Sequence, residues 1–91
     1  KEMISASFRN QLAERLNDDL NGVVERFEAQ LPELSANDRV VFIYSAAGFS
    51  IKSIGLFLNL KKSSVYTRRR RLREAIESSQ AVDKEEFISF L

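Results

Sequence analysis

The chain has 91 residues, a length that fits one small domain with a single hydrophobic core. Hydrophobic residues make up 44% and charged residues 30%, which predicts a folded chain rather than a disordered one. Cysteine and histidine are both absent, so disulfides, thiolate or imidazole metal sites, and catalysis by either side chain are excluded. We therefore expect no enzyme activity, no catalytic or metal-binding residue and no cofactor.

Charge is unevenly distributed along the sequence. Residues 1–34 hold four basic and seven acidic side chains, and residues 80–91 hold one basic and three acidic. Residues 35–79, by contrast, hold nine basic side chains and only three acidic ones. A basic middle between acidic flanks favours a polyanionic partner. No apolar run approaches the roughly 18 residues of a membrane span, and the start of the chain does not resemble a signal peptide.

The first predicted element is a long helix over residues 5–31. Either Ser5 or Ser7 could cap its start, Gly22 should weaken its middle only slightly, and Pro32 should end it. Apolar residues spaced three and four apart form one stripe along this helix: Phe8, Leu12, Leu16, Leu20, Val23, Val24, Phe27 and Leu31. The stripe predicts a core helix, or a helix that continues an upstream coiled coil or forms a dimer seam.

Four shorter helices are predicted after it. Residues 36–47 follow Ser35 as N-cap, with Asp38 at the capping-box position and Gly48 at the end. Their expected apolar face is Val40, Val41, Ile43, Tyr44 and Ala47. The next helix covers 51–58 after Ser50, and the tight turn Asn59-Leu60 leads to a helix over 62–78. The last helix covers 84–90, with Asp83 and Glu86 at capping-box spacing.

Together these elements predict an all-α fold, a helix-turn-helix bundle of about four core helices. We expect three parts: an N-terminal helical region over 1–34, a helix-turn-helix core over 35–79 and a C-terminal capping helix over 80–91. Buried residues should hold the two central helices at a fixed angle: Ile54, Leu58, Leu60, Val65 and Leu72. The small Gly55 should let the neighbouring segment approach closely.

The segment over residues 48–76 resembles the LuxR-type (GerE-like) helix-turn-helix family. The resemblance rests on a glycine, a cap serine, a lysine, a set of apolar positions and a small-residue pair before a valine, over about residues 35–78. Those residues here are Gly48, Ser50, Lys52, Ile54, Gly55, Leu58, Leu60, Ser64, Val65 and Leu72. The version that closes large bacterial sensor proteins with tetratricopeptide repeats is the most similar. The sequence departs from the family at Ser53, Gly55, Lys61, Arg68 and Arg69.

The resemblance implies that the helix over 62–78 enters the major groove of double-stranded DNA. On a helical wheel, Val65, Leu72 and Ile76 define the core side, and Arg70 lies opposite, where it could read a guanine. Tyr66 and Thr67 suit a phosphate or a thymine methyl group, and the remaining polar residues suit phosphates. The predicted DNA-binding residues are Lys61, Lys62, Ser63, Ser64, Tyr66, Thr67, Arg70, Arg71 and Arg73. Arg68 and Arg69 border the core and should pair with acids such as Asp38 or Glu33.

Three alternatives remain open at this point. The four consecutive arginines could be a solvated helix face or a non-specific polyanion patch. The fold could serve as a protein-interaction or dimerisation module, or as a sigma-factor-like promoter-recognition domain. In the favoured interpretation the chain is the output domain of a bacterial transcription regulator, with no membrane contact of its own. It would act in the cytoplasm, or as the cytoplasmic part of a membrane-anchored regulator. Homodimerisation is expected through the N-terminal helix or in the full-length protein.

Overall fold

The computed structural model describes residues 6–91, and within this range it contains six α-helices and no strand. Their bounds are α1 Ala6–Asp19, α2 Val23–Gln30, α3 Ala36–Ala46, α4 Ile51–Leu58, α5 Lys62–Glu77 and α6 Lys84–Ile88. The all-α prediction is confirmed. The predicted bounds of the three helices from α3 to α5 agree with the structure to within one residue, whereas the last helix is two residues shorter than predicted.

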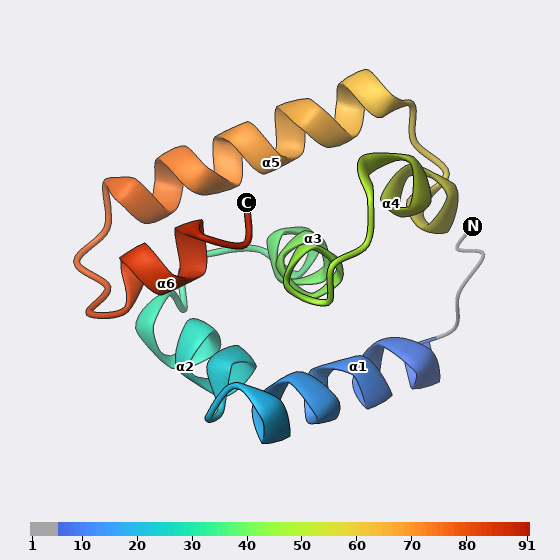
Figure 1. Cartoon of the computed structure of the whole chain (residues 1–91). Coiled ribbons are helices and arrows are strands. Elements are labelled where there is room, and N and C mark those ends of the chain that lie inside the picture. The colour runs from blue at the N-terminus through green and yellow to red at the C-terminus, as the bar shows by residue number, and fades with distance from the viewer. Residues whose placement is uncertain (1–5) are drawn as a thin grey trace.

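Helix α3 is the centre of the fold. Figure 1 looks down its axis and shows the other helices arranged around it. Five consecutive residues of α3, Val41–Ser45, are all buried. Five residues turn through more than one full turn of helix, so the second half of α3 is enclosed on every side, whereas Ala36 and Asn37 in its first turn are exposed. The prediction of a single apolar face for this helix was therefore too narrow, and it omitted Phe42, which is fully buried.

The core consists of two packed groups of side chains. In the first, the ring of Phe27 stacks on that of Phe42 at 4.0 Å, and Phe87 packs edge-on against both. The second is built on Tyr44, with Ile54 and Val65 buried beside it. The first group fastens α2 and α6 to α3, and the second fastens α4 and α5 to it.

The single long helix predicted over residues 5–31 is wrong, because the chain turns between α1 and α2. Asn21 and Gly22 both adopt left-handed backbone conformations, with φ of 57° and 73°. The side-chain oxygen of Asn17 accepts hydrogen bonds from the backbone N–H groups of Val24 and Glu25, at 2.8 and 3.2 Å. Glycine tolerates positive φ, and the asparagine side chain supplies acceptors to the new helix start, so the turn is stable. Of the two predicted caps, Ser7 lies inside α1 and Ser5 lies outside the described residues.

This turn folds the apolar stripe into the interior of the chain itself. Leu16, Val23, Val24, Phe27 and Leu31 are all buried within this one chain. Leu12 and Leu20 pack half-buried on the same core, and the half-buried Phe8 packs its ring against that of Phe49. Because its central residues are already covered, the stripe does not present the continuous seam that a coiled-coil extension would need.

Helix α6 is tied to α2 by a polar cluster. The guanidinium of Arg26 donates to Asp83 at 3.0 Å and to both carboxylate oxygens of Glu86, at 2.7 and 3.2 Å. Gln30 donates to the Asp83 carboxylate at 2.7 Å and accepts from the Asp83 backbone N–H at 3.0 Å. The hydrogen bonds from Gln30 and from Arg26 lower the pKa of Asp83. The predicted Asp83–Glu86 capping box is therefore wrong, since both carboxylates bind α2 instead.

The predicted caps of α3 and α4 are confirmed. The Ser35 hydroxyl accepts from the Asp38 N–H at 3.2 Å, and the Asp38 carboxylate accepts from the Ser35 N–H at 3.1 Å. At α4, the Ser50 hydroxyl accepts from the Ser53 N–H at 3.0 Å. Gly48 follows α3 with φ of 89°, a conformation that favours glycine. The capping box sets where α3 begins, Gly48 follows its end, and Ser50 sets where α4 begins.

Candidate nucleic-acid interface

The corner between α4 and α5 is a three-residue connection, residues 59–61. Asn59 ends α4 in the left-handed conformation, at φ 56° and ψ 49°. The next N–H, that of Leu60, bonds back to the carbonyl of Gly55 at 2.8 Å. Lys61 is extended and leads directly into α5. This backbone geometry sets the angle between the two helices.

Gly55 is where the returning chain crosses α4. A Cβ atom at this position would lie 2.7 Å from the backbone carbonyl oxygen of Leu60. Real Cβ atoms essentially never come so close to another heavy atom, so only glycine fits without a shift. The predicted close approach at Gly55 is confirmed. Ile54 and Val65 close the inside of the corner, both fully buried against Tyr44.

The core side of α5 is as predicted. Val65, Leu72 and Ile76 are 0%, 1% and 0% exposed. Their burial fixes the rotation of α5 about its own axis, so the opposite side faces outward. Leu58 and Leu60, predicted as buried corner residues, are half-buried. They pack on the Tyr44 group from its edge.

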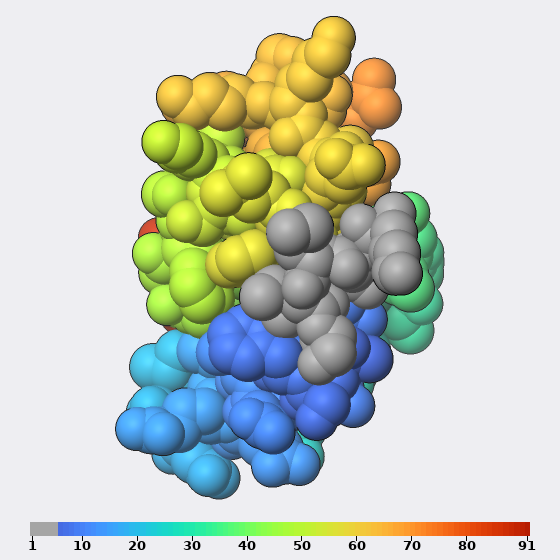
Figure 2. Space-filling model, turned by 90° about the vertical axis from the view of Figure 1, so that its right-hand side faces the viewer, coloured from blue at the N-terminus to red at the C-terminus, as the bar shows by residue number. Residues whose placement is uncertain are grey.

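The nine predicted DNA-binding residues lie along the accessible side of α5 and at its start. Figure 2 shows this part of α5, in yellow and orange, projecting at the top of the molecule, at the opposite end from α1 in blue. Ser64 and Thr67 are half-buried. The other seven are exposed: Lys61, Lys62, Ser63, Tyr66, Arg70, Arg71 and Arg73.

Four cations on this surface have no partner within residues 6–91. Lys61, Lys62, Arg70 and Arg71 form neither an ion pair nor a side-chain hydrogen bond there. Acidic residues appear on α5 only near its C-terminal end. These four cations, at the start of α5 and just beyond its middle, therefore present positive charge without an ion pair in the described structure, and such charge attracts a polyanion.

Two surface hollows flank α5. One is lined by Ile51, Tyr66, Arg69, Arg70, Arg73 and Leu91. The other is lined by Leu60, Ser63, Ser64, Thr67, Arg68 and Arg71. Each contains arginine side chains and small polar or aromatic groups, the residue types that contact phosphates and sugars. The exposed ridge of α5 between them carries Arg70 and Tyr66.

Two of the nine residues already use their polar groups inside the chain. The Thr67 hydroxyl donates to the backbone carbonyl of Ser63 at 3.0 Å, which leaves its methyl group and oxygen lone pairs for a ligand. The Arg73 guanidinium donates to the Leu91 carbonyl oxygen. A phosphate contact by Arg73 would therefore share this side chain with Leu91, which follows α6.

The acidic partners predicted for Arg68 and Arg69 are not found among the described residues. Arg69 donates to the carbonyl oxygens of Leu91, at 3.0 Å, and Phe90, at 3.4 Å. Its Nε is buried and has no hydrogen-bond partner there. The Asp38 carboxylate accepts from the Ser35 N–H in its capping box and forms no ion pair with either arginine. Both arginines are half-buried, as expected for residues that border the core.

The list of predicted site residues omitted the start of α4. Lys52 is exposed in the first turn of α4, and the adjacent Ile51 lines the same hollow as Tyr66 and Arg70. Lys52 is therefore an exposed cation one residue away from this hollow. Its membership of the basic segment was the available signal, but only the packing of α4 on α5 brings its turn of helix beside the hollow.

Other kinds of site are not evident in the described part of the chain. Between residues 6 and 91, no group of three or more acidic, histidine or cysteine side chains could hold a metal ion. No helix in the same range combines the length and the apolar character needed to cross a membrane. The chain matches no family model, no curated protein and no solved structure. The geometry of α4 and α5 must therefore carry the functional argument.

Proposed function

We propose that this chain binds double-stranded DNA sequence-specifically, with α5 in the major groove, as the output domain of a bacterial transcription regulator. The proposal includes a cytoplasmic location and the LuxR-type resemblance of residues 35–78. The observation that carries it is the uncompensated positive charge on the exposed side of a helix held by a rigid corner. A solvated surface helix would be expected to balance its cations with acids three or four residues away, and Lys61 and Lys62 have none at that spacing. Arg70 and Arg71 have Glu74 at that spacing but form no ion pair with it in the described structure.

The proposed roles follow from position on α5. Arg70 is on the outer ridge and reads a base edge, where a bidentate contact to guanine is the commonest specific contact. Lys61, Lys62 and Arg71 hold phosphates on either side of the groove. Tyr66, 60% exposed, packs against a sugar, a phosphate or a thymine methyl group. Lys52 adds a phosphate contact from α4.

We further propose that two copies bind two half-sites. Proteins that read DNA with a helix-turn-helix commonly use paired half-sites one or more helical turns apart. The central apolar residues of α1 and α2 are buried inside this chain, so the seam predicted over residues 8–31 is a poor source of dimer contact. The pairing contact is therefore assigned to the full-length protein or to the assembly on DNA.

The experiment is selection of bound duplexes from a random pool by the purified 91-residue chain. Enrichment of a defined motif, with competition by that motif and not by its scrambled version, supports the proposal. Equal retention of all duplexes would leave only a non-specific polyanion surface. No retention of DNA by a folded chain, at any salt concentration, would favour the protein-interaction alternative instead.

A further inference from the structure

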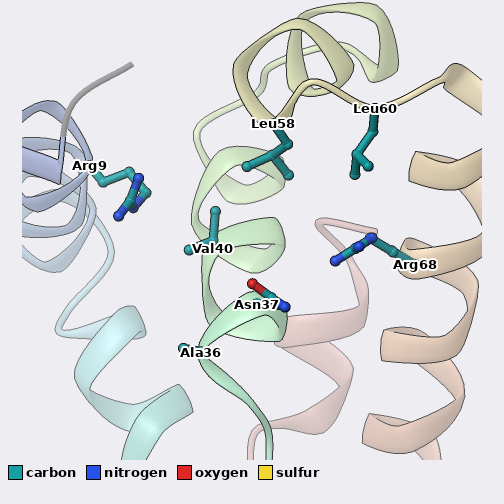
Figure 3. A pocket seen from close by; sticks show the side chains of 7 residues that line it. All are labelled: Arg9, Ala36, Asn37, Val40, Leu58, Leu60 and Arg68. Carbon is teal, nitrogen blue, oxygen red and sulfur yellow. The ribbon is translucent and has the colours of Figure 1, made fainter. Parts of the chain in front are cut away.

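Another hollow lies between α1, α3 and the α4–α5 corner, and none of the nine predicted DNA-binding residues lines it. Its volume is about 330 Å³, within the range of small-molecule sites. Figure 3 shows the side chains that line it, with Arg9 on the α1 side and Arg68 on the α5 side of α3. Its lining is Arg9, Ala36, Asn37, Val40, Leu58, Leu60 and Arg68.

The lining combines positive charge with an apolar wall. Val40, Leu58 and Leu60 supply the apolar surface, and no acidic side chain is among the described residues that line the hollow. Such a mixture of aliphatic side chains and a few convergent polar groups is typical of sites for small organic ligands.

Arg68 is the key group. It is half-buried, and within residues 6–91 it has neither an acid nor a carbonyl as partner. Its guanidinium nitrogens are not among the fully buried atoms, so a ligand can reach them. A partly desolvated and unpaired guanidinium gains more from an anion than a fully hydrated one does. The planar fork of arginine suits a carboxylate or a phosphate.

We propose that this hollow binds a small organic anion. Its oxyanion head, a carboxylate or a phosphate monoester, pairs with Arg68, with Arg9 on the opposite wall. A short aliphatic body packs on Val40, Leu58 and Leu60. The site is independent of the proposed DNA binding. It adjoins that surface, however, because Arg68 also lines a hollow flanking α5.

The test is a titration of the isotope-labelled 91-residue chain, without DNA, followed by amide chemical shifts in NMR. The probes are hexanoate, hexyl phosphate, acetate and the neutral hexanamide. The expected result is saturable shifts around Val40, Leu60 and Arg68 with hexanoate, hexyl phosphate or both. Hexanamide and acetate should each bind at least about tenfold more weakly, since one lacks the charge and the other the aliphatic body.

Two variants and a control locate the site. Arg68→Gln should weaken hexanoate or hexyl phosphate binding about tenfold or more, and Val40→Thr should weaken it by a smaller factor. Arg71→Gln removes an equally charged residue outside the hollow and should leave the affinity unchanged. The proposal is overturned if neither anion shifts these residues, if hexanamide or acetate binds as tightly, or if Arg71→Gln weakens binding as much as Arg68→Gln. The comparison of the four probes uses the unaltered chain, so it tests the proposed anion site even if a variant fails to fold.

Discussion

The backbone carbonyl oxygen of Leu60 lies only 2.7 Å from the position that a Cβ atom on residue 55 would occupy. The neighbouring atom belongs to the backbone, so it cannot rotate away as a side chain would. The corner that positions α5 therefore depends on the absence of a side chain at Gly55, and on the hydrogen bond of 2.8 Å from Leu60 N–H to the Gly55 carbonyl.

Gly55→Ala should destabilise the fold, although alanine normally stabilises a helix relative to glycine by about 1 kcal/mol. The added methyl group must displace the chain at Leu60, and such overpacking typically costs about 1–3 kcal/mol. We expect a net loss of up to about 2 kcal/mol in the free energy of unfolding, measured by urea denaturation. Leu56→Ala, on the exposed side of the same helix, should change it by less than about 0.5 kcal/mol. A stabilised Gly55→Ala variant would show that the corner is looser than described.

Tyr44→Phe should be neutral or stabilising, by up to about 1 kcal/mol. The Tyr44 hydroxyl is buried and has no hydrogen-bond partner within the described residues, while its ring packs against Phe49 and Phe57. Removing the hydroxyl keeps the ring contacts and removes an unpaired polar group from the core. Urea unfolding measures the change, with Tyr66→Phe as an exposed control. A loss of more than about 1 kcal/mol would mean that the hydroxyl is hydrogen-bonded after all.

The polar cluster between α2 and α6 should make stability depend on pH. The pKa of Asp83 is lowered in the folded chain, so its contribution is present above the unfolded value of about 3.9. That contribution is lost as the pH falls through the lower, folded pKa, because the carboxylate must then take up a proton.

Asp83→Asn should therefore lower the melting temperature at pH 7, and the difference from the parent chain should shrink in acid. Thermal unfolding followed by circular dichroism at several pH values measures this. Asp18→Asn makes the same change at an exposed carboxylate without a partner in the described structure, and it should show no such trend. Equal pH profiles for the parent chain and Asp83→Asn would exclude a role for the cluster.

Local signals predicted most of the helices. Ser35 with Asp38, Gly48 and Ser50 mark helix ends through bonds within a few residues, and these can be recognised in a sequence. The break after α1 was missed because it depends on Asn17 reaching Val24, seven residues away. The partners of Asp83 and Arg69 were predicted wrongly for a similar reason. Each binds a group more than twenty residues distant, or near the end of the chain, which only packing brings close.

The candidate site was partly predictable for the same reason. Helical periodicity placed Arg70 opposite Val65, and the structure agrees, with one exposed and the other buried. Lys52 was missed because only the packing of α4 on α5 brings its neighbour Ile51 into the hollow beside Arg70. The hollow at Arg68 could not be predicted at all, since its walls come from parts of the chain that are distant in sequence.

Mutations should distinguish the proposed base-specific contact of Arg70 from the proposed phosphate contact of Lys62. Arg70→Ala should cost about 1–3 kcal/mol on the preferred duplex and little on a scrambled one, because it removes a base contact. Lys62→Ala should weaken both duplexes equally, because a phosphate contact carries no sequence information. Both residues are exposed, so both variants should stay folded. Binding titrations on the two duplexes measure both effects. If Arg70→Ala weakens binding to the preferred and the scrambled duplex equally, Arg70 contacts only a phosphate.

The most direct test of the central claim is the salt dependence of DNA affinity. Each phosphate contact should contribute about 0.9 to the fall of log affinity with log salt. Lys61, Lys62 and Arg71 as phosphate contacts give a slope of about −2.7 per bound copy, and Lys52 would make it steeper. The measurement is fluorescence anisotropy of a labelled duplex with the 91-residue chain, over a series of salt concentrations. A slope of about −2.7 or steeper is the predicted result, and a flat slope, or no binding at low salt, would contradict the account.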